Sequence, residues 1–348
     1  MSAVPERDIG PLIWVKGEID ASFGRAGEAL SAFAEGQDRA QLKFAATHMH
    51  QAQGALAIVG LEGLTLFSQC LENLVVESER GQIEPTPRNL ALTQRALAAL
   101  RGYLDELADG QPDQPLRLWP LYSEIQAARA IAGASPSDLF FPDLGQRPPR
   151  RGAGYVAPAP DDALRIQRGA RSRFQRGLLQ YLKDSREGAE QMRDAVADVE
   201  SCQTLSTSRS FWWATQALLE VLAASDKPGD SGIKRLCGRV DGQLRRLLGG
   251  SPNVSERLMR DVLYQVAVSP VSNDLARQVR ETFRMGGLAQ AREPGKARSA
   301  PLVPVLRELR DAVQGAKDEW DRFCAGAAVG LPQFEAHTAR MESHAARI

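Results

Sequence analysis

Apolar side chains recur along most of this chain at alternating intervals of three and four residues, the repeat of an amphipathic α-helix. In the first third of the chain this pattern defines four segments. The first ends at Gly36, the second runs from Asp38 to Gly60, the third ends at Gly81 and the fourth follows Pro87. Asp is favoured at helix N-caps, Pro in first turns and Gly just beyond helix ends. Four helices with short connections predict an antiparallel bundle.

Each predicted helix carries one apolar stripe, which we expect to face the core of the bundle. A shorter helix over residues 119–131 is expected to pack on the end of the bundle. In the second helix the stripe consists of Leu42, Ala45, Met49, Ala52, Leu56 and Val59.

Residues 134–162 interrupt the helical pattern with prolines and glycines, and we interpret them as an interdomain linker. Within this stretch the apolar run Leu139-Phe140-Phe141 is expected to dock on a domain. From residue 163 onward the helical repeat returns. It predicts a long helix carrying Phe174 through Val199, a central apolar helix over residues 211–222, and several further helices.

No strand-like alternation bounded by turn residues is convincing anywhere in the chain. We therefore predict an all-α fold with two antiparallel helical bundles. The expected domains are a first bundle at residues 8–133, the linker at 134–162 and a second bundle at 163–348. A loose segment at 292–301 is expected before the last helices.

The overall charge is balanced, with 43 Lys and Arg residues and 43 Asp and Glu residues. This balance argues against nucleic acid as a partner and against a basic membrane-binding surface. The four cysteines, Cys70, Cys202, Cys237 and Cys324, have no paired spacing and are expected to be small buried side chains in a reducing compartment. No secretion signal and no uncharged apolar run of membrane-spanning length is evident. We expect a cytoplasmic protein without membrane insertion.

His50 is the residue most suggestive of chemistry. It follows the stripe residue Met49, which places it about 100° around the helix from the core, at the edge of the buried face. Gln53, Gly54 and Ala57 share its side of the helix. Glycine costs about 1 kcal/mol against alanine inside a helix. Gly54 therefore suggests that open space is needed beside the imidazole.

On the next predicted helix, Glu72 follows the stripe residue Leu71 in the same way. An antiparallel neighbour would bring its carboxylate toward His50. A carboxylate that accepts a hydrogen bond from one ring nitrogen fixes the tautomer and leaves the other nitrogen nucleophilic.

These residues carry a family resemblance. His50-x-x-Gln53-Gly54-Ala55, followed by Leu71-Glu72-Asn73-Leu74, resembles the histidine phosphotransfer (Hpt) domain of CheA-type chemotaxis kinases over roughly residues 8–110. In that family the pattern is His-x-x-Lys-Gly-Ser/Ala on a bundle helix. The resemblance implies that His50 is the phosphorylated residue and that Glu72 orients its ring. The family's lysine is Gln53 here, and an amide supplies hydrogen bonds but no positive charge.

A second resemblance covers most of the chain. Residues 10–19, 138–144 and 211–214 are similar to the N-terminal region of the group that contains the ChpA/PilL hybrid kinases and FimL. This group implies a role in the chemosensory control of type IV pili and twitching motility, and it contains repeated phosphotransfer-like bundles. No histidine lies between His50 and His337. The second bundle is therefore predicted to be a degenerate Hpt-like bundle without that chemistry.

The sequence does not support any other class of functional site. Phosphate-loop, dinucleotide-binding and paired-histidine metal motifs are not evident, so we expect no cofactor and no metal. His337 and His344 are expected on a frayed, solvated helix. No ATP-binding kinase core is recognisable, so whether the chain is an enzyme stays open.

Two functions remain. One is an adaptor or phosphocarrier in a phosphorelay, with receiver domains, a chemosensory kinase or a polar scaffold protein as partners. The other is a non-catalytic scaffold that binds the same partners.

Overall fold

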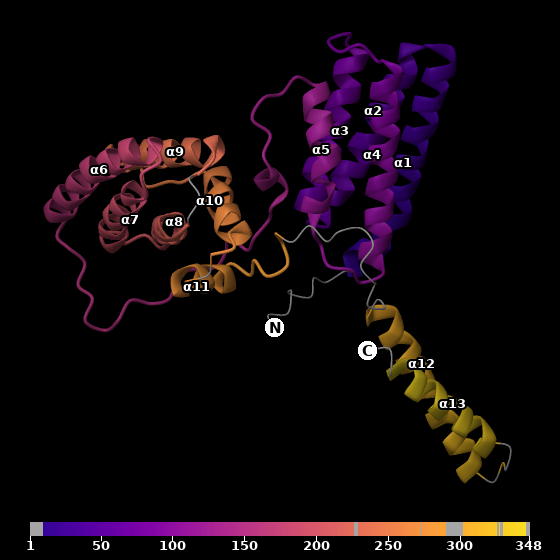
Figure 1. Cartoon of the computed structure of the whole chain (residues 1–348). Coiled ribbons are helices and arrows are strands. Elements are labelled where there is room, and N and C mark those ends of the chain that lie inside the picture. The colour runs from indigo at the N-terminus through magenta and orange to yellow at the C-terminus, as the bar shows by residue number, and fades with distance from the viewer. Residues whose placement is uncertain are drawn as a thin grey trace. The chain divides into compact units, whose positions relative to one another are not determined.

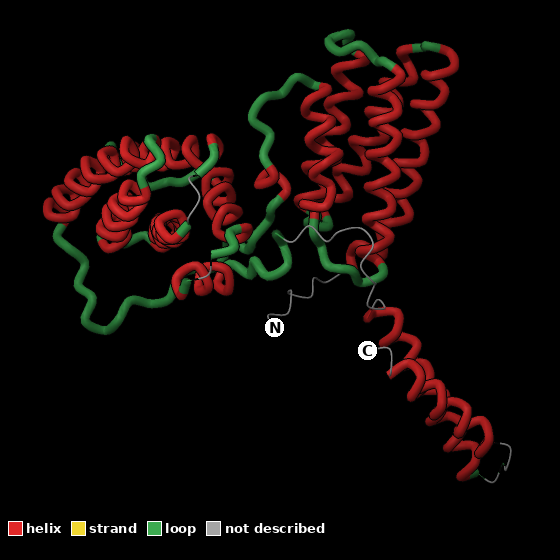
Figure 2. The backbone as a smooth tube through the Cα atoms, in the orientation of Figure 1, coloured by secondary structure: helices red, strands yellow, loops and turns green. Residues whose placement is uncertain are grey.

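The computed structural model describes residues 10–225, 229–271, 273–289, 302–325, 327 and 330–345. Throughout this described part the regular structure is helical, and the predicted all-α fold is confirmed (Figure 2). Contacts divide the residues into two compact units. One comprises 10–113, 124–131 and the C-terminal segment from 302, and the other comprises 114–123 and 132–289. The segment expected to be loose at 292–301 lies outside the described residues.

The first four helices form the N-terminal bundle: α1 (Gly10–Gly36), α2 (Arg39–Ile58), α3 (Glu62–Glu79) and α4 (Pro87–Ala108). Helix α2 lies between α1 and α3, and both of those helices also contact α4 (Figure 1). The ends follow the local sequence. The Asp38 side chain accepts a hydrogen bond from the amide of Ala40, and Thr86 caps α4 in the same manner. Gly60 and Gly81 have positive φ angles of 75° and 72°, which glycine adopts at little cost.

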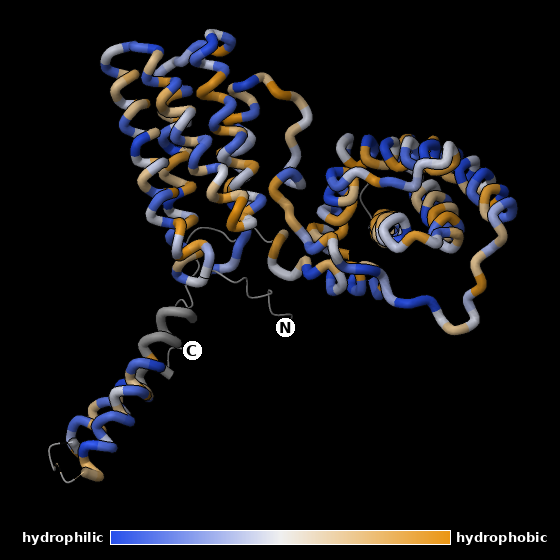
Figure 3. The backbone as a smooth tube through the Cα atoms, turned by 180° about the vertical axis from the view of Figure 1, so that it is seen from behind, coloured by the Kyte–Doolittle hydropathy of each residue, from blue (hydrophilic) through white to orange (hydrophobic). Residues whose placement is uncertain are grey.

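Each helix of the N-terminal bundle buries one stripe, and apolar positions recur along the tubes at the helical interval (Figure 3). The predicted stripe of α2 is buried from Leu42 to Leu56, and only its last residue, Val59, is half-buried. Burial of such stripes supplies most of the stability of short helices.

Helix α5 (Trp119–Ala128) lies along the side of α3 and α4 instead of on the end of the bundle (Figure 1). Two ion pairs, one from within α5 and one from the residue that follows it, hold it there. Arg129 contacts Glu77 of α3 at 2.6 Å, and Glu124 contacts Arg95 of α4 at 3.2 Å. The hydrogen bond from Arg129 to Glu77 raises the pKa of this guanidinium above its usual value.

In the second helical unit, defined here as residues 132–289, the described residues form six α-helices. They are α6 (Pro160–Leu182), α7 (Arg186–Ser201), α8 (Ser206–Ala224), α9 (Ser231–Leu248), α10 (Glu256–Val268) and α11 (Asp274–Thr282). Two short 3₁₀ helices, η1 (Pro115–Leu118) and η2 (Pro136–Leu139), contact each other. No helix among the described residues combines the length and the apolar character needed to cross a bilayer.

The prediction of a single long helix from Phe174 to Val199 is wrong, because the chain turns back between α6 and α7. Asp184 adopts a left-handed conformation with φ of 64°, and the polar residues around it contain neither Gly nor Pro. The turn is stabilised instead by close contact between the two helices. Gly177 of α6 and Gly188 of α7 face each other without side chains, which lets the backbones approach.

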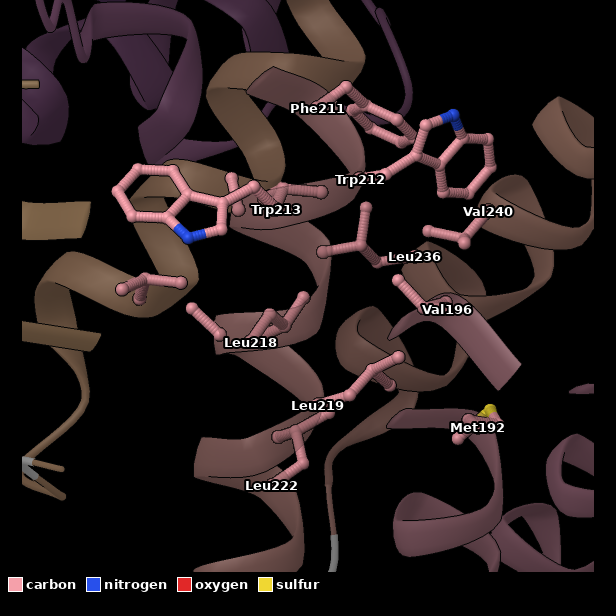
Figure 4. Packing of buried hydrophobic residues seen from close by; sticks show 14 of the residues in the cluster. Met192, Val196, Phe211, Trp212, Trp213, Leu218, Leu219, Leu222, Leu236 and Val240 are labelled. Carbon is pink, nitrogen blue, oxygen red and sulfur yellow. The ribbon is translucent and has the colours of Figure 1, made fainter. Parts of the chain in front are cut away.

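Helix α8 is the centre of this unit (Figures 1 and 4). Thirteen of its nineteen residues are buried, so it has almost no solvent-facing side. Trp212 is fully buried and packs edge-on against Phe211, with ring centroids 4.8 Å apart. Figure 4 shows Leu236 and Val240 of α9 and Met192 and Val196 of α7 gathered around α8, in agreement with the central position predicted from its composition.

Much of the proline-rich segment between residues 134 and 159 is packed against the helices of the second helical unit. Phe140 is buried and meets Tyr264 of α10 edge-on at a centroid distance of 5.6 Å. Arg151 donates to the carbonyl of Gln203 at 2.9 Å, and the Tyr155 hydroxyl donates to the carbonyl of Ser201 at 2.6 Å. These contacts anchor a stretch whose composition alone resembles a free linker.

Helices α12 (Leu302–Cys324) and α13 (Gly330–Ala345) form a hairpin of their own. The ring of His337 lies against Gly315. The prediction that this histidine is on a frayed, solvated helix is therefore wrong. Its Nδ1 atom is buried and has no hydrogen-bond partner in the described part of the chain. Cys324 is exposed, whereas the other three cysteines are buried as expected.

The contact between α6 and α7 predicts a difference between two glycine substitutions in α6. A β-carbon at Gly177 would lie 2.7 Å from the carbonyl oxygen of Gly188, whereas one at Gly169 would meet no atom within 4 Å. Gly177→Ala should therefore lower the free energy of unfolding by about 2 kcal/mol. Gly169→Ala should leave it unchanged or raise it by up to about 1 kcal/mol. Urea denaturation followed by circular dichroism measures both, and equal effects would contradict this account.

Candidate functional site

The candidate site lies where α2 and α3 of the N-terminal bundle meet. Met49 is fully buried, and the next residue, His50, has a side chain that is 74% exposed. The imidazole thus sits at the edge of the buried stripe, where a partner molecule can reach it. Once α2 is oriented so that its apolar stripe is buried, the His50 ring lies at the edge of that stripe.

Glu72 comes from the same level of α3, one residue after the buried Leu71. The Nδ1 atom of His50 lies 3.1 Å from Oε1 and 3.4 Å from Oε2 of Glu72. The Glu72 side chain is only 16% exposed, so its carboxylate is partly shielded from water. A carboxylate only accepts hydrogen bonds, which makes Nδ1 of the neutral ring the donor. The Nε2 atom then carries the lone pair and is the nucleophilic nitrogen.

Gly54 provides open space one turn after His50. A β-carbon at this position would meet no atom within 4 Å. Gln53 is half-buried on the same helix, adjacent to the histidine stripe. The structure therefore brings His50 and Glu72 into contact and leaves Gly54 open beside them, while Gln53 offers an uncharged amide.

Two exposed apolar residues of α2 were not anticipated from the sequence. Phe44 is 55% exposed and Ile58 is 87% exposed, and both belong to the solvent-facing side of α2. Viewed down the axis of α2, Phe44 lies about 120° and Ile58 about 80° from His50, both in the same direction around the helix. The two residues are 14 positions apart, about 21 Å along the helix, so they do not form one contiguous patch, and single exposed apolar residues are common on protein surfaces. In the sequence, both can be recognised as apolar residues that lie outside the predicted apolar stripe of α2.

The second helical unit has no equivalent constellation in its central helix. Trp212 and Trp213 are buried core residues. In the part of the chain that the structure describes, no three His, Cys, Asp or Glu side chains gather closely enough to hold a metal ion.

An exposed histidine on a bundle helix, held by a carboxylate of the adjacent antiparallel helix, is the arrangement expected from the family resemblance. Residues 13–110 match the family model of the Hpt domain. Residues 159–295 match the family described as the FimL scaffold protein second domain. The resemblances inferred from the motifs around His50 and from the longer similarity are thereby confirmed.

Among curated proteins, this chain is similar to the scaffold protein FimL of Pseudomonas aeruginosa. The two are 28% identical over 330 residues, which is 90% of this chain and 58% of that protein. The chain thus spans somewhat more than half the length of this curated relative. No solved structure gives a significant match.

The geometry of the Hpt domain predicts the tautomer of His50. In the wild type, at a pH where the ring is neutral, Nδ1 should carry the proton and Nε2 the lone pair. The Glu72→Gln variant should lose this preference, because an amide both donates and accepts hydrogen bonds. Ring ¹⁵N chemical shifts distinguish the two nitrogens. Glu62→Gln, which removes an exposed carboxylate from the same helix, is the matched control and should leave the shifts unchanged. Identical shifts in wild type and Glu72→Gln would show that the carboxylate does not orient the ring.

Proposed function

We propose that this chain is a cytoplasmic signalling adaptor of a two-component chemosensory phosphorelay, and that its Hpt domain accepts a phosphoryl group at His50. The observation that carries the proposal is the contact between the exposed imidazole and the shielded carboxylate of Glu72. In this arrangement Nε2 points the nucleophilic lone pair away from α3, toward an approaching phosphoryl donor.

The reaction would run as follows. Nε2 of His50 attacks the phosphorus of an aspartyl phosphate on a receiver domain, or of a phosphohistidine on a kinase. A P–N bond to His50 forms as the bond to the donor breaks, and the donor leaves as its free carboxylate or imidazole. The ring becomes positively charged during the transfer, and the Glu72 carboxylate, bound at Nδ1, stabilises that charge. The open space at Gly54 would accommodate the phosphoryl oxygens or the active-site loop of the donor.

The second candidate is a scaffold that binds the same partners without chemistry. Gln53 favours it, because no positive charge is supplied at the position where the family pattern has lysine. The printed name of the Pseudomonas relative, a scaffold protein, agrees with this role as well.

The pathway is proposed from similarity alone. The resemblance to the ChpA/PilL and FimL group supports a role in the control of type IV pili and twitching motility. Receiver domains, a chemosensory kinase or a polar scaffold protein are the corresponding partners.

A labelling experiment separates the two candidates. The chain is incubated with a kinase and receiver of its own organism under conditions that label a known Hpt domain. A phosphocarrier should acquire a label that is labile in acid and stable in alkali. His50→Gln should remove the label, and His48→Gln, which changes a neighbouring histidine on α2, should retain it. No label on the wild type would refute phosphotransfer and leave the scaffold.

Restoring the lysine of the family pattern should strengthen the reaction. Gln53→Lys places an ammonium group about one turn from His50, where it can stabilise the phosphoryl charge by about 1 kcal/mol. We expect about a fivefold higher yield of phosphorylated protein. The control is Gln41→Lys, which adds the same charge about 14 Å from residue 50 along α2. Equal yields from both variants would show that charge at residue 53 has no specific role.

A further inference from the structure

Helix α9 of the second helical unit carries a stripe of arginines. Arg235, Arg239, Gly242 and Arg246 are separated by four, three and four residues, so they lie on one face of the helix. The opposite face is buried in the core through Leu236, Cys237, Val240 and Leu244, among others. The arginines therefore face solvent, and Gly242 leaves a gap in the middle of their stripe.

A hollow of about 370 Å³ lies over this gap, between α9 and the start of α10. A β-carbon at Gly242 would meet no atom within 4 Å, so the floor of the hollow is open. Three of its lining residues carry guanidinium groups, and none carries a carboxylate. The lining consists of Arg239, Gly242, Arg245, Arg246, Ser255 and Leu258.

One of these guanidinium groups is held in place by a buried side chain. Gln243 is fully buried, and its Oε1 atom accepts a hydrogen bond of 2.6 Å from Nη2 of Arg246. Its Nε2 atom donates to the carbonyl of Asn253 at 2.9 Å, in the segment that leads into α10. The amide thus fixes Arg246 relative to the opposite wall. An arginine fixed before binding loses less conformational entropy when it contacts a ligand.

The opposite wall is the N-terminus of α10. Ser255 is the N-cap, and its hydroxyl oxygen accepts a hydrogen bond from the amide of Leu258 at 3.3 Å. The free amides of a first helical turn and the helix dipole favour anions at this end. Glu256, the first residue of α10, is exposed and is not part of the lining.

The charges around the hollow do not cancel. Arg239 is paired with Asp261, whose carboxylate also accepts a hydrogen bond from Ser137. Within the described residues, Arg245 and Arg246 form no ion pair. Two positive charges therefore remain on one side of the hollow and a helix N-terminus on the other.

We propose that this hollow, the α9–α10 arginine pocket, binds a small molecule that carries phosphate. Guanidinium groups bind phosphate oxygens through two parallel hydrogen bonds, and two of them match a dianion better than a monoanionic carboxylate. The volume falls at the lower end of small-ligand pockets, which fits a diphosphate or a phosphate monoester. The site belongs to a different domain from His50 and needs no chemistry there.

The test uses inorganic pyrophosphate and AMP as probes, titrated calorimetrically into the full chain at low salt. The Arg245→Gln/Arg246→Gln variant should bind pyrophosphate at least tenfold more weakly. Both side chains are exposed, so the fold should be retained. Arg168→Gln, which removes an exposed arginine of α6 outside the pocket, is the control and should bind as the wild type does.

A second variant tests the pocket without changing its charge. Gly242→Leu fills the open floor at a half-buried helical position, where an added β-carbon meets no atom within 4 Å, and should also abolish binding. The proposal is overturned if pyrophosphate and AMP do not bind the wild type, or if the double variant and Arg168→Gln weaken binding equally. It is equally overturned if only an acidic peptide binds.

Discussion

Burial of one apolar stripe per helix is the constraint from which the functional surfaces of this protein follow. A helix that buries its stripe has a fixed rotation, and every other residue then has a fixed direction. His50 follows the buried Met49, and Glu72 follows the buried Leu71, so the rotations of α2 and α3 place both side chains where the two helices meet. The hydrogen bond between His50 and Glu72 therefore follows from the burial of the two apolar stripes.

The two units use their helices differently. In the N-terminal bundle each helix keeps a polar side, and α2 presents an imidazole on it. In the second helical unit α8 is surrounded by its neighbours and buries Trp212 completely. A helix without a solvent-facing side cannot present a group to a partner protein. Polar recognition in this unit is consequently left to the surrounding helices, of which α9 carries the arginine stripe.

Glycine has opposite roles in these helices. Gly54 and Gly242 leave space open beside an imidazole and beside arginines, and a side chain there would meet nothing. Gly177 and Gly188 allow two backbones to touch, and a side chain there would collide with a carbonyl oxygen. All four lie within helices, where glycine is locally unfavourable by about 1 kcal/mol. At Gly177 and Gly188 the close contact of the two helices offsets this cost, whereas at Gly54 and Gly242 the structure shows only open space.

The sequence by itself determined the helical class, the ends of the first four helices and the pair of neighbouring side chains His50 and Glu72. These features are encoded locally, by the helical repeat, by caps such as Asp38 and by single steps from a stripe. The central position of the helix around Trp212 also followed from its composition, because a helix that is apolar on all sides has to be buried.

Only the tertiary structure decided the rest. The turn at Asp184 has no Gly or Pro, and it closes because Gly177 and Gly188, eleven residues apart, meet across it. The proline-rich segment is anchored by Phe140 and Arg151 on partners more than 45 residues away in the chain. Likewise, Arg246 is positioned through Gln243 by a carbonyl of another segment. A local pattern does not reveal such contacts, because their free energy is gained only when distant parts of the chain are brought together.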